Sequence, residues 1–208
     1  MSDMVTFLKT AADQYCDPKR YYHTLEHIQQ MFRDAQMFCP EPLSDVQVMA
    51  IWGHDIVYIP GYANNEADSA DMTIKTLKGE LSQSQLDAVA AIIIATKTHL
   101  PPFPEAAKVV VDLDLLGLGF PPPVYRRATR RIWEEVKAHG DNPVGLSEFV
   151  EGRIKFLDAY GSRDHLFHTP WGRRFESRAK LNMKTEEQWL RYDPSDYLES
   201  IGIMDPLV

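Results

Sequence analysis

The sequence predicts an all-α protein, and three observations lead to this prediction. Apolar residues recur at intervals of three and four over most of the chain, as they do along one face of a helix. Proline and glycine fall between these periodic segments, where they end helices. No segment alternates apolar and polar residues long enough to predict a strand, since the three valines at 109–111 form only a short run in a helical pattern.

Capping and breaking residues bound the expected helices. Asparagine, serine and aspartate are good N-caps, and proline and glycine stop helices. The residues that mark boundaries in this way are Pro18, Pro40, Pro42, Ser44, Asp45, Asn64, Asn65 and Gly79. The helices themselves are expected at about 3–14, 24–38, 45–53, 65–79, 84–96, 105–116, 123–139, 144–160 and 171–192.

Length and composition predict one domain over residues 1–208, because a chain of this size can bury a single sizeable core. The two cysteines, Cys16 and Cys39, are too few for a disulfide framework and fit a reducing compartment. No run approaches the roughly 18 apolar residues of a membrane span, and the N-terminal segment does not resemble a secretory signal. We therefore expect a cytoplasmic protein with no membrane partner.

The net charge of −8 argues against nucleic acid as the main partner, because binding to a phosphate backbone needs a concentrated positive field. A run of four arginines does occur at 126–131, but two glutamates follow it on the same expected helix. This pattern predicts a solvated helix face with ion pairs between neighbouring turns.

Histidines in the first half of the chain stand beside acidic residues. His23 and His27 are four residues apart, so a helix that includes both places the two imidazoles on one face. His54-Asp55 follows an apolar run, where a charged carboxylate is costly unless it is paired or bound to a cation. Each feature alone also fits an ordinary surface or core role.

Two more acids, Asp112 and Asp114, lie in the apolar segment 109–116, where a cation would again offset the cost of burial. Together the histidines and carboxylates form a ligand set that suits Mg, Mn, Fe or Zn better than a metal that prefers thiolates. The candidate ligands occur along the chain in the order His, His-Asp, Asp.

In this order the sequence resembles the HD superfamily of metal-dependent phosphohydrolases, whose ligands come from separate helices of a bundle. The resemblance is closest to a bacterial group of predicted HD phosphohydrolases of unassigned substrate with a Tyr-His-x-x-x-His-Ile opening. The matching segments are Tyr22-His23 to His27-Ile28, His54-Asp55, Asn65-Glu66-Ala67-Asp68-Ser69-Ala70 and Asp112-Leu113-Asp114-Leu115. The match continues through Ala95 to His99 and to Glu176, Arg178 and Asn182, so it covers most of the chain.

The resemblance implies an HD-type helical bundle with its metal-site core at about 20–120 and C-terminal helices at about 123–192 packing on it. The implied metal ligands are His27, His54, Asp55 and Asp114. Asp112 and Asp114 point about 200° apart on a helix, so only one can face the metal, and Asp114 is chosen from the resemblance. The ion is a divalent metal, either Mn, Mg, Fe, Co, Ni or Zn, and the sequence leaves open whether one or two ions bind.

His23, Asp55 and Glu66 are the expected catalytic residues. The opening also resembles that of cyclic-nucleotide phosphodiesterases, in which the first histidine donates a proton and the second binds metal; this similarity implies His23 as the acid. Glu66 and Asn65 are expected to orient the attacking water or a ligand histidine. The alternative for both is helix capping.

Four residues are expected to contact the substrate. Arg20 and Lys97 flank proposed site histidines and could neutralise a phosphate group. Asn65 and His99 complete the expected set, and His99 is also the obvious supplementary ligand for a second ion.

The expected function is hydrolysis of a phosphomonoester or phosphodiester, in a nucleotide or another small phosphate ester, by water that the metal activates. Two alternatives stay open: a di-iron oxygenase of the HD fold, and a nucleotide-binding HD module without catalysis. The sequence gives neither the substrate nor the oligomeric state.

Overall fold

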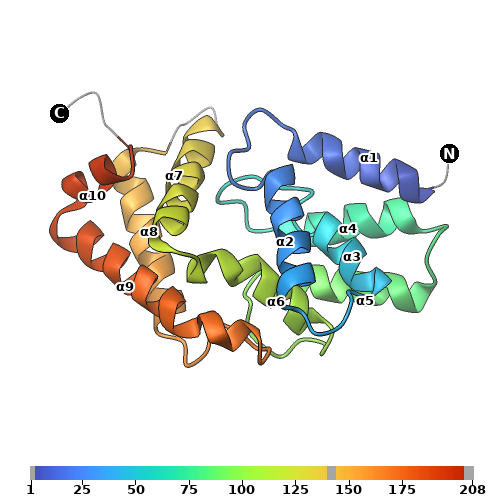
Figure 1. Cartoon of the computed structure of the whole chain (residues 1–208). Coiled ribbons are helices and arrows are strands. Elements are labelled where there is room, and N and C mark those ends of the chain that lie inside the picture. Colours follow the sequence, from blue (N-terminus) through green and yellow to red (C-terminus); the bar gives the residue numbers. More distant parts are fainter. Residues whose placement is uncertain (1–2, 140–143, 204–208) are drawn as a thin grey trace. The chain divides into compact units, whose positions relative to one another are not determined.

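The computed structural model describes residues 3–139 and 144–203, and within these ranges it contains helices and no strands (Figure 1). The predicted all-α class is confirmed. No helix among the described residues is long and apolar enough to cross a membrane. The chain divides into two compact units, Met1–Asp114 and Leu115–Val208, each described below by itself. That the chain forms one domain stays a prediction.

The first unit contains the helices that the periodicity predicted, with boundaries shifted by a few residues. Asn64 is the N-cap of the fourth helix and Asn65 its first residue. Ser44 and Ser82 begin their helices with reciprocal capping boxes, each bonded to a glutamine three residues later. The helices are α1 Asp3–Tyr15, α2 Leu25–Phe38, α3 Asp45–Gly53, α4 Asn65–Leu77, α5 Gln83–Ala95 and α6 Ala107–Leu115.

The end of α3 approaches α4 and α5 closely, and this fixes where the chain emerges from the helix. A Cβ atom on Gly53 would overlap the side chain of Thr73 on α4 and touch Ile93 on α5. Only glycine therefore fits here without movement of its neighbours. The residues that follow, His54 and Asp55, are placed by this contact.

The loop after α3 is tied back to the first two turns of α4. The side-chain amide of Asn65 donates to the carbonyl of Ile59, and its oxygen accepts from the Ile59 amide. The hydroxyl of Ser69 makes the same pair of bonds with Val57. Both polar side chains are buried and their polar atoms are hydrogen-bonded. Specific hydrogen bonds therefore hold the loop in addition to apolar packing.

Helix α6 carries buried apolar side chains. Val110, Val111 and Leu113 are almost completely inaccessible. The chain just before α6 is fixed to α3, because the Gln47 amide donates to the carbonyl of Ala106 over 3.0 Å. This anchoring brings the last turn of α6, which carries Asp114, to a defined place.

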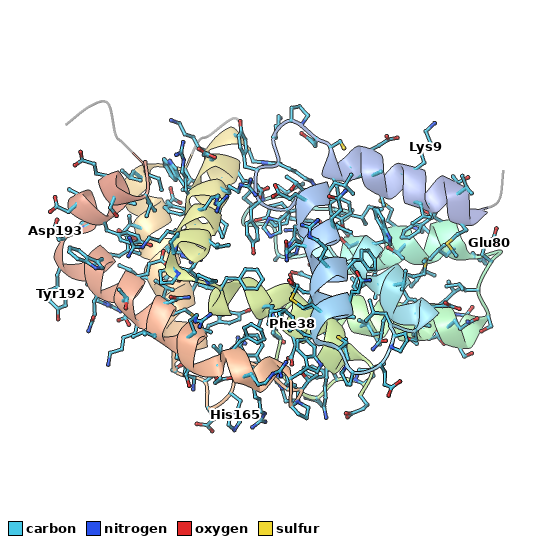
Figure 2. All side chains as sticks on the ribbon, in the orientation of Figure 1. Lys9, Phe38, Glu80, His165, Tyr192 and Asp193 are labelled. Atoms are coloured by element: carbon cyan, nitrogen blue, oxygen red, sulfur yellow. The ribbon has the colours of Figure 1, made fainter. Side chains whose placement is uncertain are left out.

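The second unit contains the remaining helices. The sequence predicted one long helix at 171–192, whereas the chain forms a short 3-10 turn followed by α9. A further helix, α10, was not predicted, although Asp193 accepts from the Asp196 amide as an N-cap and Pro194 occupies the first helical position. The elements are η1 Leu116–Gly119, α7 Pro122–Ala138, α8 Leu146–Gly161, η2 Gly172–Phe175, α9 Glu176–Tyr192 and α10 Pro194–Ser200. Figure 2 shows the Tyr192 side chain, which is 86% exposed, pointing outwards at the break between α9 and α10.

A polar cluster lies buried between α7, α8 and α9. Arg153 forms a two-pronged ion pair with Glu186, with Nε–Oε1 and Nη2–Oε2 distances of 3.0 and 2.9 Å. Thr129 accepts from the same guanidinium, and Tyr125 donates its hydroxyl proton to Glu186. We call Tyr125, Thr129, Arg153 and Glu186 the arginine cluster.

Candidate metal centre

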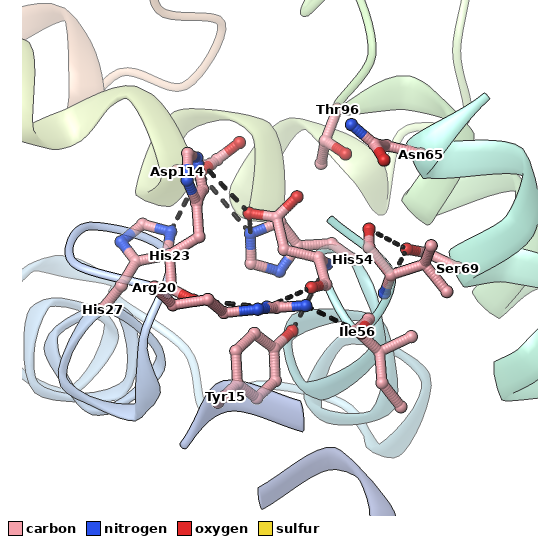
Figure 3. Close-up of polar contacts among 12 residues, drawn as sticks. Tyr15, Arg20, His23, His27, His54, Ile56, Asn65, Ser69, Thr96 and Asp114 are labelled. Carbon is pink, nitrogen blue, oxygen red and sulfur yellow. Dashed lines mark hydrogen bonds and ion pairs between the residues drawn. The ribbon is translucent and has the colours of Figure 1, made fainter. Parts of the chain in front are cut away.

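Four side chains from three separated stretches of the first unit meet around one point (Figure 3). His27 comes from α2, His54 and Asp55 directly follow α3, and Asp114 comes from the last turn of α6. Each offers one nitrogen or oxygen, and these atoms all lie within 4.8 Å of one another. The group could hold a metal ion, and we call it the metal centre.

His54 shows why the centre suits a cation. Its ring is fully buried, and Nδ1 donates to the carbonyl of Ile51 over 2.9 Å, so the lone pair of the neutral ring lies on Nε2. Nε2 lies 3.0 Å from an Asp55 oxygen and 3.6 Å from an Asp114 oxygen and has no hydrogen-bond partner among the described residues. A lone pair facing two carboxylates is unfavourable unless a proton or a cation lies between them.

The pKa shifts in the centre follow from the same arrangement. Burial favours neutral groups, but the carboxylates of Asp55 and Asp114 outweigh it and raise the pKa of His54 well above its usual value. Burial likewise opposes ionisation of Asp55, yet His54 and then His23 lower the pKa of that carboxyl to about 2. Without a metal ion, a proton on His54 therefore balances the two carboxylates.

Asp114 is held from two sides. Its Oδ1 lies 3.1 Å from Nε2 of His27, and its Oδ2 lies 2.8 Å from Nε2 of His99. Burial raises the pKa of Asp114, but the imidazoles of His27, His54 and His99 outweigh this effect and keep the pKa well below its usual range. The four-residue group contains Asp114 and not Asp112, which is buried two positions earlier on α6.

His99 is more enclosed than a substrate-contacting residue is expected to be. Its side chain is 9% exposed, and its backbone adopts a φ of +55°, which is unusual for a residue other than glycine. Such backbone strain persists where the surroundings fix the residue in place. The short contact with Asp114 makes His99 a partner of a metal-centre carboxylate.

His23 borders the metal centre without belonging to its four-residue group. Its Nε2 lies 3.9 Å from an Asp55 oxygen, and 17% of its side chain is exposed. The ring stacks on Tyr58 with a centroid distance of 3.8 Å, and the edge of the Tyr22 ring contacts it as well. These contacts hold the imidazole beside the centre with part of its surface open to solvent.

Two residues expected to contact substrate are instead committed to the protein backbone. The Arg20 guanidinium donates to three main-chain carbonyls. The Asn65 side-chain amide accepts from the Ile59 N–H and donates to the Ile59 carbonyl. Arg20 and Asn65 are each 7% exposed. Both side chains thus have main-chain partners, and the expected substrate role of Arg20 and Asn65 stays a prediction.

Lys97 and Glu66 lie beside each other. Lys97 Nζ is 3.9 Å from a Glu66 oxygen and also donates to the carbonyl of Ala63, while 44% of the Lys97 side chain is exposed. Glu66 lies in the first turn of α4 and outside the four-residue group. Their expected roles, in substrate binding for Lys97 and in catalysis for Glu66, stay predictions.

Tyr15 supports the metal centre and was missed from the sequence, where it looks like an ordinary apolar residue at a helix end. Its buried hydroxyl accepts from the Asp55 amide over 3.3 Å and donates to the carbonyl of Trp52 over 3.1 Å. Burial, followed by the charge of Asp55, raises the pKa of Tyr15 well above its usual value. The hydroxyl stays a neutral donor that holds the turn after α3.

Comparisons of the chain with family models, with curated proteins and with solved structures gave no match. What is established is an all-α chain with a His-Asp group that could hold a metal ion.

Proposed function

We propose that the chain is a metal-dependent phosphohydrolase of the HD type, acting on a nucleotide or another small phosphate ester. One observation carries the proposal: His27, the adjacent pair His54 and Asp55, and Asp114 converge, in that order along the chain, from separate helices. Two imidazoles and two carboxylates are ligands that suit Mn, Mg, Fe, Co, Ni or Zn.

The donor set fits a divalent ion. The buried Nε2 of His54 faces two carboxylate oxygens, and two carboxylates with two neutral imidazoles balance the charge of such an ion. When bound, the ion supplies Lewis-acid polarisation of the phosphate group and lowers the pKa of water to about 7, which is worth on the order of 12 kcal/mol. That contribution exceeds any other that the site offers.

In the proposed reaction, His23 is the general acid. From the edge of the centre, its Nε2 donates a proton to the oxygen of the leaving group, which would otherwise depart as an alkoxide. Its stack on Tyr58 orients the ring, and its Nε2 lies 3.9 Å from an Asp55 oxygen. A positioned acid of this kind usually contributes about 10²- to 10⁴-fold in rate.

The test is a panel of phosphomonoesters and phosphodiesters incubated with chelator-treated protein, with and without Mn, Mg, Co, Ni, Fe and Zn. We expect at least one ester to be hydrolysed only when an ion is added. Consumption of O₂ by protein with two irons would replace the proposal with the oxygenase alternative. Tight nucleotide binding without turnover under every ion would replace it with the binding module.

A further inference from the structure

Arg20 joins two distant segments that border the metal centre (Figure 3). Its Nη1 donates to the carbonyl of His23 over 3.2 Å and to the carbonyl of Asp55 over 2.7 Å. Its Nη2 donates to the carbonyl of Ile56 over 3.0 Å. One guanidinium thus connects the segment before α2 with the turn after α3.

The three bonds need the shape of this side chain. A guanidinium is planar and presents its N–H groups in a rigid fork, whereas an ammonium group is a single point on a flexible stem. Because Arg20 is buried, loss of one of these bonds is costly. A lysine at this position would keep the charge and lose the fixed spacing between the acceptors.

The same guanidinium contacts the aromatic rings that hold His23 and Asp55. Its Cζ lies 5.2 Å from the ring centre of Tyr15, whose hydroxyl accepts from the Asp55 amide. It lies 5.9 Å from the ring centre of Tyr58, which stacks on the His23 imidazole. Arg20 therefore bonds to the backbones of His23 and Asp55. It also contacts the two aromatic rings beside them, Tyr58 next to His23 and Tyr15 next to Asp55.

We propose that Arg20 is a positioning residue that fixes the backbone of His23 against the Asp55–Ile56 turn, and that it does not bind the substrate phosphate. Its catalytic consequence rests on the proposed function, because only a working acid at His23 makes this placement matter for rate. Both Nη1 protons are used by carbonyls, so a phosphate ion could reach Nη1 only by displacing the carbonyl of His23 or of Asp55.

The first experiment compares Arg20→Lys with Arg33→Lys, a matched change at an exposed arginine on α2. For Arg20→Lys we expect kcat to fall about 10- to 100-fold, with KM and the inhibition constant of inorganic phosphate within about 3-fold of wild type. Arg33→Lys should match wild type in all three. A rise of about 10-fold or more in KM and the inhibition constant at unchanged kcat would show a phosphate-binding role and overturn the proposal.

A second measurement does not depend on activity. Nuclear magnetic resonance of the Zn-loaded protein reports the chemical shifts of the His23 ring, which the ring current of the stacked Tyr58 displaces. We expect Arg20→Lys to reduce that displacement and Arg33→Lys to leave it unchanged. An unchanged His23 signal in Arg20→Lys would overturn the positioning role even if the protein hydrolyses esters, and a changed signal would support it even if it hydrolyses none.

The wild-type protein provides a test that needs no variant, should Arg20→Lys fail to fold. The Nη1 protons of Arg20 should exchange slowly with solvent, because the carbonyls of His23 and Asp55 accept them. Adding inorganic phosphate to the Zn-loaded protein should leave their signals in place. Fast exchange, or a saturable shift with phosphate, would contradict the proposal.

Discussion

The arginine cluster of the second unit and the metal centre of the first are both buried polar groups, but they differ in how their charges are matched. In the arginine cluster, the two oxygens of Glu186 accept from Arg153 and Tyr125, and Thr129 takes a further guanidinium proton. The charges of Arg153 and Glu186 are thus matched within the chain.

The metal centre has more acceptors than donors. The carboxylates of Asp55 and Asp114 face the lone pair of His54 Nε2, which the chain leaves without a hydrogen bond among the described residues. The protein balances them with a proton or with a cation from outside. The comparison teaches that a buried cluster which satisfies itself is structural, and that one short of positive charge is a candidate for binding an ion.

The largest effect is expected for Asp55→Ala, which removes a proposed ligand from the centre. We expect loss of metal binding and a fall in turnover on the order of 10³-fold or more, because the contribution of the ion is lost. Metal content after dialysis and steady-state rates measure the two effects. The matched control is Asp71→Ala, an exposed acid on α4 that pairs with Lys75, and it should behave as wild type. An Asp55→Ala protein free of metal but fully active would remove the metal centre from the mechanism.

Glu186→Ala tests the other side of the comparison. Removal of the carboxylate leaves the buried Arg153 charge without its ion-pair partner, at a cost of about 3–5 kcal/mol in the free energy of unfolding. Urea unfolding measures this loss, and added metal ions should not restore it. Joint replacement by Arg153→Met and Glu186→Leu should cost much less. If both variants lose equal stability, the ion pair is not what matters at this place.

His23→Ala separates the proposed acid from the ligands. We expect turnover to fall about 10²-fold, or roughly 2.7 kcal/mol, while the affinity for metal changes by less than about 3-fold. His165→Ala, at an exposed histidine of the second unit, serves as control. Loss of metal from His23→Ala would make His23 a ligand and would contradict its assignment as acid.

The smallest effect concerns a buried carboxylate with only an amide partner. Burial raises the pKa of Asp34 from 3.8 to about 6, although Gln30 donates to it over 2.8 Å. The folded protein therefore binds this proton more tightly than the unfolded chain, and that stabilisation, complete below pH 3.8, is lost as the pH rises through about 6.

Asp34→Asn should thus be more stable than wild type by about 1 kcal/mol at pH 8, an amount that allows for screening by solvent. The difference should disappear near pH 3.5. Thermal unfolding of metal-free protein at several pH values measures it. A stability difference independent of pH would show that Asp34 does not titrate as its burial suggests.

Much of the fold could be predicted because helical periodicity and capping are local signals. The helices of the first unit begin and end within a few residues of their predicted places, and Ser44, one of the two cap candidates with Asp45, is the N-cap of α3. Helix α10 was missed, although Asp193 and Pro194 are a recognisable start signal. The boundary of α9 was wrong because the 3-10 turn Gly172–Phe175 runs directly into the helix at Glu176, with no proline or glycine between them to mark the change.

The candidate site was predictable in its ligands and less so in its supports. His54 and Asp55 could be found because a charged pair after an apolar run needs a partner, and Asp114 was separated from Asp112 only by resemblance. The roles of Arg20 and Tyr15 could not be read from the sequence, because both depend on main-chain groups that come close only after folding. Nearness along the sequence to a site histidine suggested phosphate binding for Arg20, and it gave no sign of the three main-chain contacts that the guanidinium makes.

Binding of a divalent ion by the chain tests the central claim most directly. Chelator-treated wild-type protein and Asp114→Asn are titrated with Mn²⁺ in a calorimeter, and thermal unfolding is followed at each ion concentration. We expect saturable binding to the wild type with stabilisation of about 2.7 kcal/mol at 100 times the dissociation constant, and neither effect in the variant. A wild-type protein that neither binds nor is stabilised by any of the six metals, or an Asp114→Asn variant that binds as the wild type does, would contradict it.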